Sequence, residues 1–219
     1  MKKWGVVIAP LTIAAVLFSA CAQTTPTTTD TTTESDTITI GAIAPLTGDA
    51  AAYGTPLQRV AELTVEEINA NGGVNGKKLA IKWENGECNA KSAATAGQKL
   101  IDIDKVEVVL GGFCSSETLA LAPIAEAAQV VTLSTGSSNP SITNAGDYIF
   151  RDYPSDASQG ELDANAALTA GYTKAVVLSE QTDYALGVKD VFVEKFTAGG
   201  GEATVETFSS ETTDFKTAL

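Results

Sequence analysis

Apolar strand-like runs alternate with helix-like segments along most of this 219-residue chain, and this alternation restricts its fold more than any other feature. Strand–helix–strand connections of this length join parallel strands, so the pattern predicts an α/β fold with a doubly wound parallel sheet. A Thr55-Pro56 pair predicts the start of the first helix, with a proline in its first turn. We expect strands at 38–44, 78–83, 106–110 and 130–133, and helices at 55–71, 90–103 and 116–128.

The alternation begins again after residue 151 and predicts a second, shorter α/β series. We therefore expect two lobes, the first at 38–154 and the second at 155–219. The last six residues, 214–219, are typical of the opening of a further helix. The second lobe is accordingly expected to be incomplete and the chain to be a fragment. The elements expected in the second lobe are helices at 158–170 and 184–197 and strands at 175–179 and 203–208.

Charge and composition exclude several classes of function. The chain has 27 acidic and 14 basic side chains, a net charge of −13, which argues against nucleic acid as a partner. It has no histidine, which removes histidine triads, histidine general bases and the usual zinc sites. Three cysteines are too few for a zinc site of four thiolates. We expect no metal, no cofactor and no enzymatic activity.

The N-terminus is typical of an exported protein. Two lysines precede an apolar run at 4–18, which is too short to span a membrane and fits a secretory signal peptide at 1–20. The segment Leu-Phe-Ser-Ala-Cys at 17–21 resembles a bacterial lipobox, which would make Cys21 a lipidated first residue. The alternative is ordinary cleavage after Ala20, which leaves a free thiol. The threonine-rich stretch at 21–37 predicts a disordered tether.

Cys88 and Cys114 then remain as a possible pair in a chain that leaves the cytoplasm. Disulfides persist in such compartments, so we expect a bond that closes a loop of 26 residues. The alternative is two unrelated buried thiols.

Polar and aromatic residues follow several of the expected strands, where ligands bind in open parallel sheets. A helix start with two hydroxyls at Ser115-Ser116 suits a small carboxylate, and the loop from Gly136 through Ser137 to Ser138 could bind an ammonium group. None of these residues is a base or a nucleophile, so the pattern predicts binding without chemistry. The alternatives are a helix cap at Ser115 or Ser116, an ordinary turn at 134–139 and half-buried loop tyrosines at 53 and 184. For Asp156, the residues alone favour a helix cap.

Together these segments resemble the extracytoplasmic leucine/isoleucine/valine-binding proteins, the type I solute-binding family that serves ABC transporters. The resemblance runs from Ile38 to the last residue. It rests on Ile-Ala-Pro-Leu-Thr-Gly at 43–48, Asn-Gly-Gly-Val-Asn-Gly at 71–76, Gly-Gly-Phe-Cys-Ser-Ser at 111–116, Asn139-Pro140, Ser155-Asp156, Gln159-Gly160 and Asp214-Phe215.

The resemblance implies a two-lobed periplasmic-binding-protein fold and a site for an amino acid. It places a disulfide at Cys88 and Cys114. It implies that Ser115 and the Ser138 hydroxyl, with the Gly136 backbone, hold the carboxylate and ammonium, that Asp156 is a further ammonium ligand, and that Tyr53 and Tyr184 close over the side chain near Phe113. Gly136 and Ser138 stand where a close branched-chain binder is expected to have Ala and Thr.

The function implied is that of a lipid-anchored, extracytoplasmic or periplasmic protein that captures a small neutral amino acid, branched-chain or other, and delivers it to an ABC permease. We expect a monomer. One alternative is the ligand-sensing ectodomain of a receptor with the same fold. Another is a dinucleotide-dependent enzyme, which the lack of histidine and of a Gly-x-Gly-x-x-Gly motif opposes.

Overall fold

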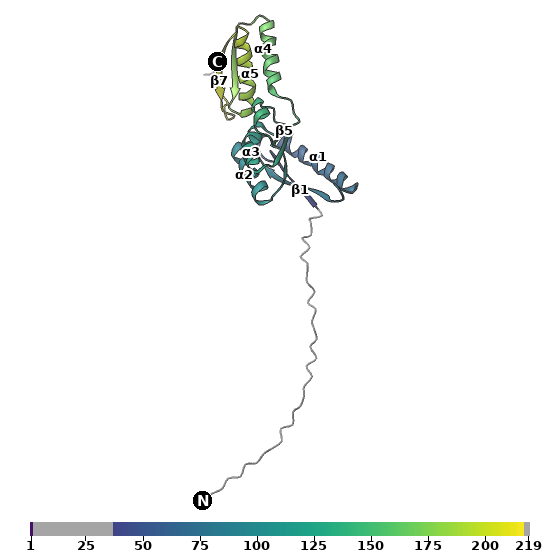
Figure 1. Ribbon diagram of the computed structural model, residues 1–219. Helices are drawn as coiled ribbons and strands as arrows, with labels where there is room; N and C mark the ends of the chain where they lie inside the picture. The colour runs from purple at the N-terminus through teal and green to yellow at the C-terminus, as the bar shows by residue number, and fades with distance from the viewer. Residues whose placement is uncertain (2–36, 217–219) are drawn as a thin grey trace. The chain divides into compact units, whose positions relative to one another are not determined.

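The computed structural model describes Met1 and residues 37–216, and the described residues from 37 onward belong to one compact unit (Figure 1). Apart from their end residues Met1 and Thr37, the expected signal peptide at 1–20 and tether at 21–37 lie outside the described residues, as does Cys21. None of the described helices has both the length and the apolar character needed to span a membrane.

The first part of the unit is a five-stranded parallel sheet, which confirms the predicted α/β class. The strand order is β2-β1-β3-β4-β5, and every neighbouring pair is parallel. Short β5 was not foreseen, because three residues are too few to show an alternating pattern. The strands are β1 (Thr37–Ala44), β2 (Lys78–Asn85), β3 (Val108–Leu110), β4 (Val131–Ser134) and β5 (Ile149–Arg151).

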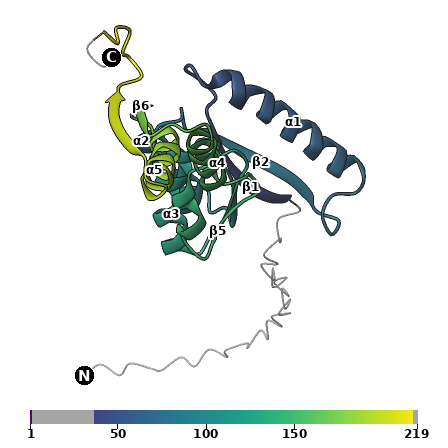
Figure 2. The same ribbon diagram turned by 90° about the horizontal axis from the view of Figure 1, so that it is seen from above.

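Helices cover both faces of this sheet. Figure 2 shows α1 (Ala51–Ala70) on one side of β1 and β2, with α2 (Ala90–Gln98) and α3 (Ser115–Ala128) on the other. A π-helical turn, Lys99–Ile103, continues α2, and a 3₁₀ helix, Pro140–Asn144, precedes β5. The core lies between the sheet and the pair α2 and α3, where small side chains let the helices approach closely. Its fully buried members include Ile43, Ala93, Leu100, Val109, Leu121 and Ala125.

Helix α1 begins at Ala51, one turn before the predicted start at Thr55-Pro56, and Pro56 lies inside the helix. The reason is a close contact between α1 and the residue that follows β1. A Cβ atom on Gly54 would overlap the carbonyl of Pro45, so only glycine permits this approach. The contact fixes the first turn of α1 beside the end of β1.

The second part of the unit contains α4 (Asp156–Thr169), β6 (Lys174–Glu180), α5 (Asp183–Ala198) and β7 (Glu202–Phe208). Strands β6 and β7 are parallel and form a separate two-stranded sheet. The predicted helix at 214–219 is not seen in its described part, since residues 214–216 are not helical, and 217–219 lie outside the described residues. The predicted lobe boundary after residue 154 stays a prediction.

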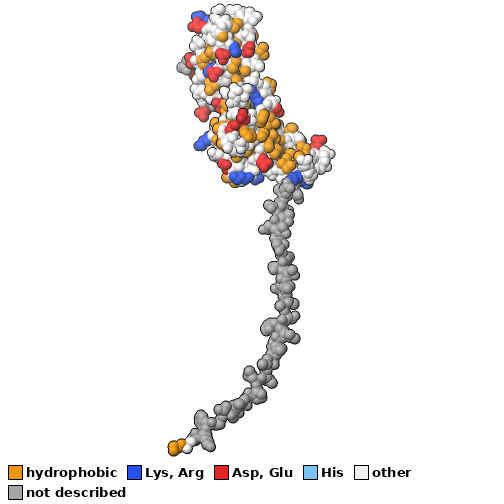
Figure 3. All heavy atoms as spheres, in the orientation of Figure 1, with side chains coloured by type: hydrophobic (Ala, Val, Ile, Leu, Met, Phe, Trp, Pro, Cys, Tyr) orange, Lys and Arg blue, Asp and Glu red, His pale blue; other side chains and the backbone are white. Residues whose placement is uncertain are grey.

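Large apolar side chains are exposed on both parts. On α1, Val60 is 62% and Leu63 64% exposed, and on β6 Val176 is 66% exposed. Figure 3 shows hydrophobic side chains gathered on the surface beside α1. The well-buried face of the five-stranded sheet is therefore the one that packs against α2 and α3.

Candidate functional site

A cavity of about 930 Å³ lies beyond the carboxyl ends of the parallel strands. Its walls come from segments that follow the five strands of the first sheet, as expected where parallel strands end at one edge, and from residues at and after the end of β6 in the second sheet. Six of the seven residues predicted to bind a ligand line it. They are Tyr53, Ser115, Gly136, Ser138, Asp156 and Tyr184. That they contact a ligand stays a prediction.

Ser115 is the first residue of α3 and is 2% exposed. The alternative that Ser115 or Ser116 caps this helix is wrong, because the N-cap residue is Cys114. The Ser115 hydroxyl accepts a hydrogen bond from the Asn139 backbone N–H at 3.2 Å, which ties α3 to the loop after β4. The first N–H groups of a helix have no partners within the helix and carry a partial positive charge. The cavity therefore has an anion-attracting end at Ser115.

Ser137, the seventh predicted residue, is fully buried and does not line the cavity. Its hydroxyl donates toward the carbonyls of Gly112 and Phe113, each at 3.1 Å, and shares a hydrogen bond with Thr118 at 2.7 Å. Ser137 therefore holds the loop after β4 against the loop after β3. That it contacts a ligand stays a prediction.

Ser138 differs from its neighbour in this loop. It is 3% exposed and lines the cavity, and its hydroxyl has no hydrogen-bond partner among the described residues. Its carbonyl accepts the Asp156 backbone N–H at 2.9 Å, which joins the loop to the start of α4. Ser138 thus lines the cavity from a backbone that is tied to the start of α4.

Asp156 is the first residue of α4 and is 6% exposed. The cap predicted for Asp156 is instead Ser155, whose hydroxyl accepts the Ala157 N–H at 3.3 Å. Among the described residues, the buried Oδ2 atom of Asp156 has no hydrogen-bond partner. A buried carboxylate oxygen without a donor is unfavourable, so this atom suits a cationic or N–H-bearing ligand.

The pKa of the Tyr184 hydroxyl is raised above its ordinary value. Its side chain is 50% exposed and lines the cavity at the start of α5. Burial raises the pKa of the Tyr184 hydroxyl, and the negative charges of Asp156 and Tyr153 raise it further. The hydroxyl therefore stays protonated at neutral pH and can donate a hydrogen bond into the cavity.

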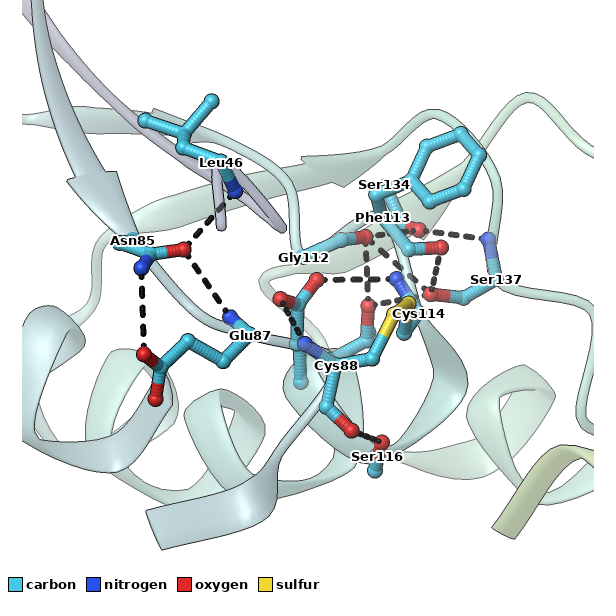
Figure 4. Close-up of a disulfide and its surroundings, with 12 residues drawn as sticks. Leu46, Asn85, Glu87, Cys88, Gly112, Phe113, Cys114, Ser116, Ser134 and Ser137 are labelled. Carbon is cyan, nitrogen blue, oxygen red and sulfur yellow. Dashed lines mark hydrogen bonds between the residues drawn. A yellow bond between two sulfur atoms is a disulfide. The ribbon is translucent and has the colours of Figure 1, made fainter. Parts of the chain in front are cut away.

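The Cys88–Cys114 disulfide is confirmed (Figure 4), and both cysteines line the part of the cavity that we call its floor. It joins the loop after β2 to the N-cap of α3, with a Cα–Cα distance of 5.2 Å. The alternative of two separate thiols is thereby excluded. The Ser116 hydroxyl adds a second link by donating to the Cys88 carbonyl at 2.9 Å.

Glu117 supports this floor and was missed in the sequence analysis. It is fully buried, and its two carboxylate oxygens accept the backbone N–H groups of Cys88 at 3.0 Å and Cys114 at 2.9 Å. Burial raises the pKa of the Glu117 carboxyl, and these backbone hydrogen bonds oppose the shift. The spacing Cys-Ser-Ser-Glu at 114–117 is that of a capping box, a signal that could have identified the residue.

Asn85, at the end of β2, is a second missed residue. Its Oδ1 accepts the N–H of Leu46 at 2.8 Å and that of Glu87 at 3.3 Å, which holds the loop after β1 beside the disulfide loop (Figure 4).

Metal binding is not favoured at the cavity floor. Within the described part of the chain, Cys88, Cys114 and Glu117 form a group with metal-ligand spacing. Its sulfurs are bonded to each other and its carboxylate is occupied by two N–H groups, so these residues do not fit a metal.

A cavity at the strand ends of a parallel α/β unit, with an anion-attracting helix end and an unpaired carboxylate, defines a small-solute binding protein. The family model described as "Periplasmic binding protein" matches residues 37–219, so the chain belongs to that family of binding proteins, which is not a family of enzymes.

Two curated relatives are named for amino acids. The chain is 32% identical over 177 residues to an amino acid binding protein of Pseudomonas aeruginosa, which covers 74% of this chain and 47% of the relative. It is 29% identical over 155 residues to the leucine-specific-binding protein of Salmonella typhimurium, a match that covers 70% of this chain and 42% of the relative. The chain thus spans about half the length of the curated relatives it matches.

Solved structures of binding proteins are also similar to this chain. The leucine binding protein of Thermotoga maritima is similar with a TM-score of 0.74 and 30% identity, covering 83% of this chain and 51% of that one. The branched-chain amino acid binding protein of Streptococcus pneumoniae, in complex with isoleucine, has a TM-score of 0.70 and 33% identity. The match covers 83% of this chain and 52% of that one. A solute binding protein of an ABC transporter from Rhodopseudomonas palustris, in complex with 3,4-dihydroxybenzoic acid, has a TM-score of 0.70 and 28% identity. The match covers 84% of this chain and 50% of that one.

Removing the disulfide tests how far the cavity floor depends on it. We expect the double variant Cys88→Ser/Cys114→Ser to lower the free energy of unfolding by about 3.5 kcal/mol, because the bond closes a 26-residue loop in the unfolded chain. Urea denaturation under oxidising conditions measures the difference. Wild-type protein unfolded with a reductant should match the double variant, and an equal stability of variant and oxidised wild type would contradict the expectation.

The buried carboxyl of Glu117 predicts a pH-dependent effect. Its pKa in the folded protein is raised, so the stability it contributes is complete below its ordinary pKa and is lost as the pH rises through the raised value. We expect Glu117→Gln to be less stable than wild type by about 1–3 kcal/mol near pH 4. The gap should narrow toward about pH 7.

Denaturant titrations at several pH values measure this gap. Glu62→Gln, on the exposed face of α1, controls for the loss of one negative charge. A gap between wild type and Glu117→Gln that widens as the pH rises would show the sign to be wrong.

Proposed function

We propose that this chain is the ligand-capturing part of an ABC-transporter solute-binding lipoprotein that takes up a small neutral amino acid. Membership of the periplasmic binding protein family supports the capture role. The names of the relatives support an amino acid, since two similar solved structures are those of a leucine binding protein and of an isoleucine complex.

The observation that carries this proposal is the buried Oδ2 of Asp156, which has no hydrogen-bond partner among the described residues, at a cavity that also holds the N-terminus of α3. A helix N-terminus favours a carboxylate, and a buried carboxylate favours a cation. A zwitterionic amino acid satisfies both groups at once. Unsubstituted benzoate has no donor to pair with Asp156, and the dihydroxybenzoate of the Rhodopseudomonas palustris complex offers hydroxyl donors but no positive charge.

The remaining predicted residues have consistent positions. Ser138 and Gly136 line the cavity together with Ser115, and Tyr53 and Tyr184 line it from α1 and α5. We assign Ser115, Gly136 and Ser138 to the charged end of the amino acid and the tyrosines to its side chain. The ligand would lie between the lobes at 38–154 and 155–219.

Anchoring is the second part of the proposal. Lipidation of Cys21 and a tether at 21–37 would keep the monomeric protein outside the cytoplasm at a membrane surface, near its permease. Several acyl chains hold a protein firmly where one would be marginal. The lipobox-like residues 17–21 and the export signal support this arrangement.

Asp156→Asn tests the ammonium assignment. In the product of the complete reading frame, we expect this variant to bind neutral amino acids about 10- to 100-fold more weakly, because a charge-assisted hydrogen bond in a buried site is lost. Isothermal titration calorimetry measures the affinity. Asp163→Asn is the matched control, since Asp163 lines the cavity from the same helix but is exposed, and we expect a change of about twofold. Unchanged amino-acid affinity in Asp156→Asn, or tighter binding of benzoate than of any amino acid, would refute the assignment.

Cys21→Ala tests the anchor. We expect the wild-type protein to incorporate labelled palmitate and to sediment with membranes, whereas the variant is unlabelled and released, because only the cysteine thiol accepts the lipid. Cys88→Ser/Cys114→Ser, which keeps Cys21, should retain the label. Unlabelled, soluble wild-type protein beginning at Cys21 would support ordinary signal cleavage instead.

A further inference from the structure

One wall of the cavity is a pair of stacked aromatic rings. The rings of Tyr53 and Phe113 have centroids 6.1 Å apart and planes inclined by 20°. Tyr53 comes from the first turn of α1 and Phe113 from the loop after β3, and both line the cavity. Phe113 is partly buried, while Tyr53 is 66% exposed. The fold thus brings two aromatic rings together at the cavity, with their planes nearly parallel.

Gly136 lies against the Phe113 ring. A Cβ atom at position 136 would lie 2.7 Å from both Cδ2 and Cε2 of the Phe113 ring and 2.9 Å from the Phe113 carbonyl oxygen. These distances are shorter than ordinary van der Waals contacts. The ring therefore rests against the backbone of the loop after β4, which only a glycine permits. Gly136 does not adopt a left-handed φ, so alanine at this position would meet a steric obstacle and no backbone strain.

The backbone around Phe113 is held on both sides. The carbonyl of Phe113 accepts the Ser137 hydroxyl, the Gly112 carbonyl accepts the hydroxyls of Ser134 and Thr118, and the Cys114 N–H donates to Glu117. Figure 4 shows Phe113 within this network, between Gly112 and the disulfide. A side chain at position 136 would therefore displace the ring more readily than the backbone. The displaced ring would occupy space that the cavity now offers to a ligand.

We infer that Phe113 and Gly136 form a matched pair that determines ligand specificity, and that the site prefers an α-amino acid with an aromatic side chain over one with a branched aliphatic side chain. This inference rests on the proposed amino-acid function. Because Gly136 lets the ring recede, the cavity gains width next to aromatic rings. Aromatic side chains gain edge or stacking contacts with such rings beyond their burial. Tyr153 and Tyr184, each 50% exposed, supply further rings to the lining.

Calorimetric titration with phenylalanine, leucine and benzoate tests the inference on the product of the complete reading frame. We expect the wild type to bind phenylalanine about 3- to 10-fold more tightly than leucine. Phe113→Leu should abolish this preference while retaining leucine binding. Gly136→Ala should weaken phenylalanine binding about tenfold and leucine binding less, because the displaced ring narrows the cavity.

Two further variants serve as a control and as a check on folding. Tyr172→Leu removes an exposed aromatic ring that does not line the cavity and should leave the preference unchanged. If Gly136→Ala folds poorly, Gly136→Ala/Phe113→Leu should restore folding, since leucine can move away from the new methyl group, and should bind leucine at least as well as phenylalanine.

Leucine binding equal to or tighter than phenylalanine binding in the wild type would overturn the inference and leave the proposed amino-acid function standing. A preference for phenylalanine that persists in Phe113→Leu would also overturn it. Binding of benzoate without binding of either amino acid would overturn the proposed function itself.

Discussion

The buried carboxylate of Glu117 is the interaction on which the cavity most depends. It accepts N–H groups from Cys88 and Cys114, so one side chain of α3 fixes both ends of the disulfide. Gly86 and Gly112 provide the space, because a Cβ on either would overlap Glu117. Any change at these positions would move the loop after β2 and the start of α3 together. The position of the anion-attracting end at Ser115 follows from this arrangement.

The cavity lining combines charged and polar side chains with aromatic rings. Ser115 stands at a helix N-terminus, while at the start of another helix Asp156 has a buried carboxylate oxygen without a hydrogen-bond partner among the described residues. The rings of Tyr53, Phe113, Tyr153 and Tyr184 also line the cavity. A binding site of this kind needs no reactive group, since it gains affinity by replacing the water around both charges of a zwitterion with fixed protein partners. A site without a reactive group agrees with a family that binds solutes without transforming them.

The sequence predicted the class of fold well because parallel α/β units leave a strong periodic signal. Nearly all expected strands and helices of the described region are present, with differences of a few residues at their ends. The errors have local causes. Helix α1 starts early because Gly54 packs against Pro45, and β5 was missed because three residues show no period. Ser155, not Asp156, caps α4, a shift of one residue that frees the Asp156 side chain to face the cavity.

The sequence by itself determined the alternating elements, the acidic charge, the lack of histidine chemistry and the residue types at the strand ends, because these depend on composition and local periodicity. Only the tertiary structure decided which of those residues share a cavity. It turned Ser137 inward to three partners, while the neighbouring Ser138 hydroxyl has no partner among the described residues. It also set the Phe113 ring against Gly136 and buried Glu117 next to the disulfide. The contacts that hold Ser137 and that join Glu117 to Cys88 span 19 to 29 positions, which no local pattern encodes.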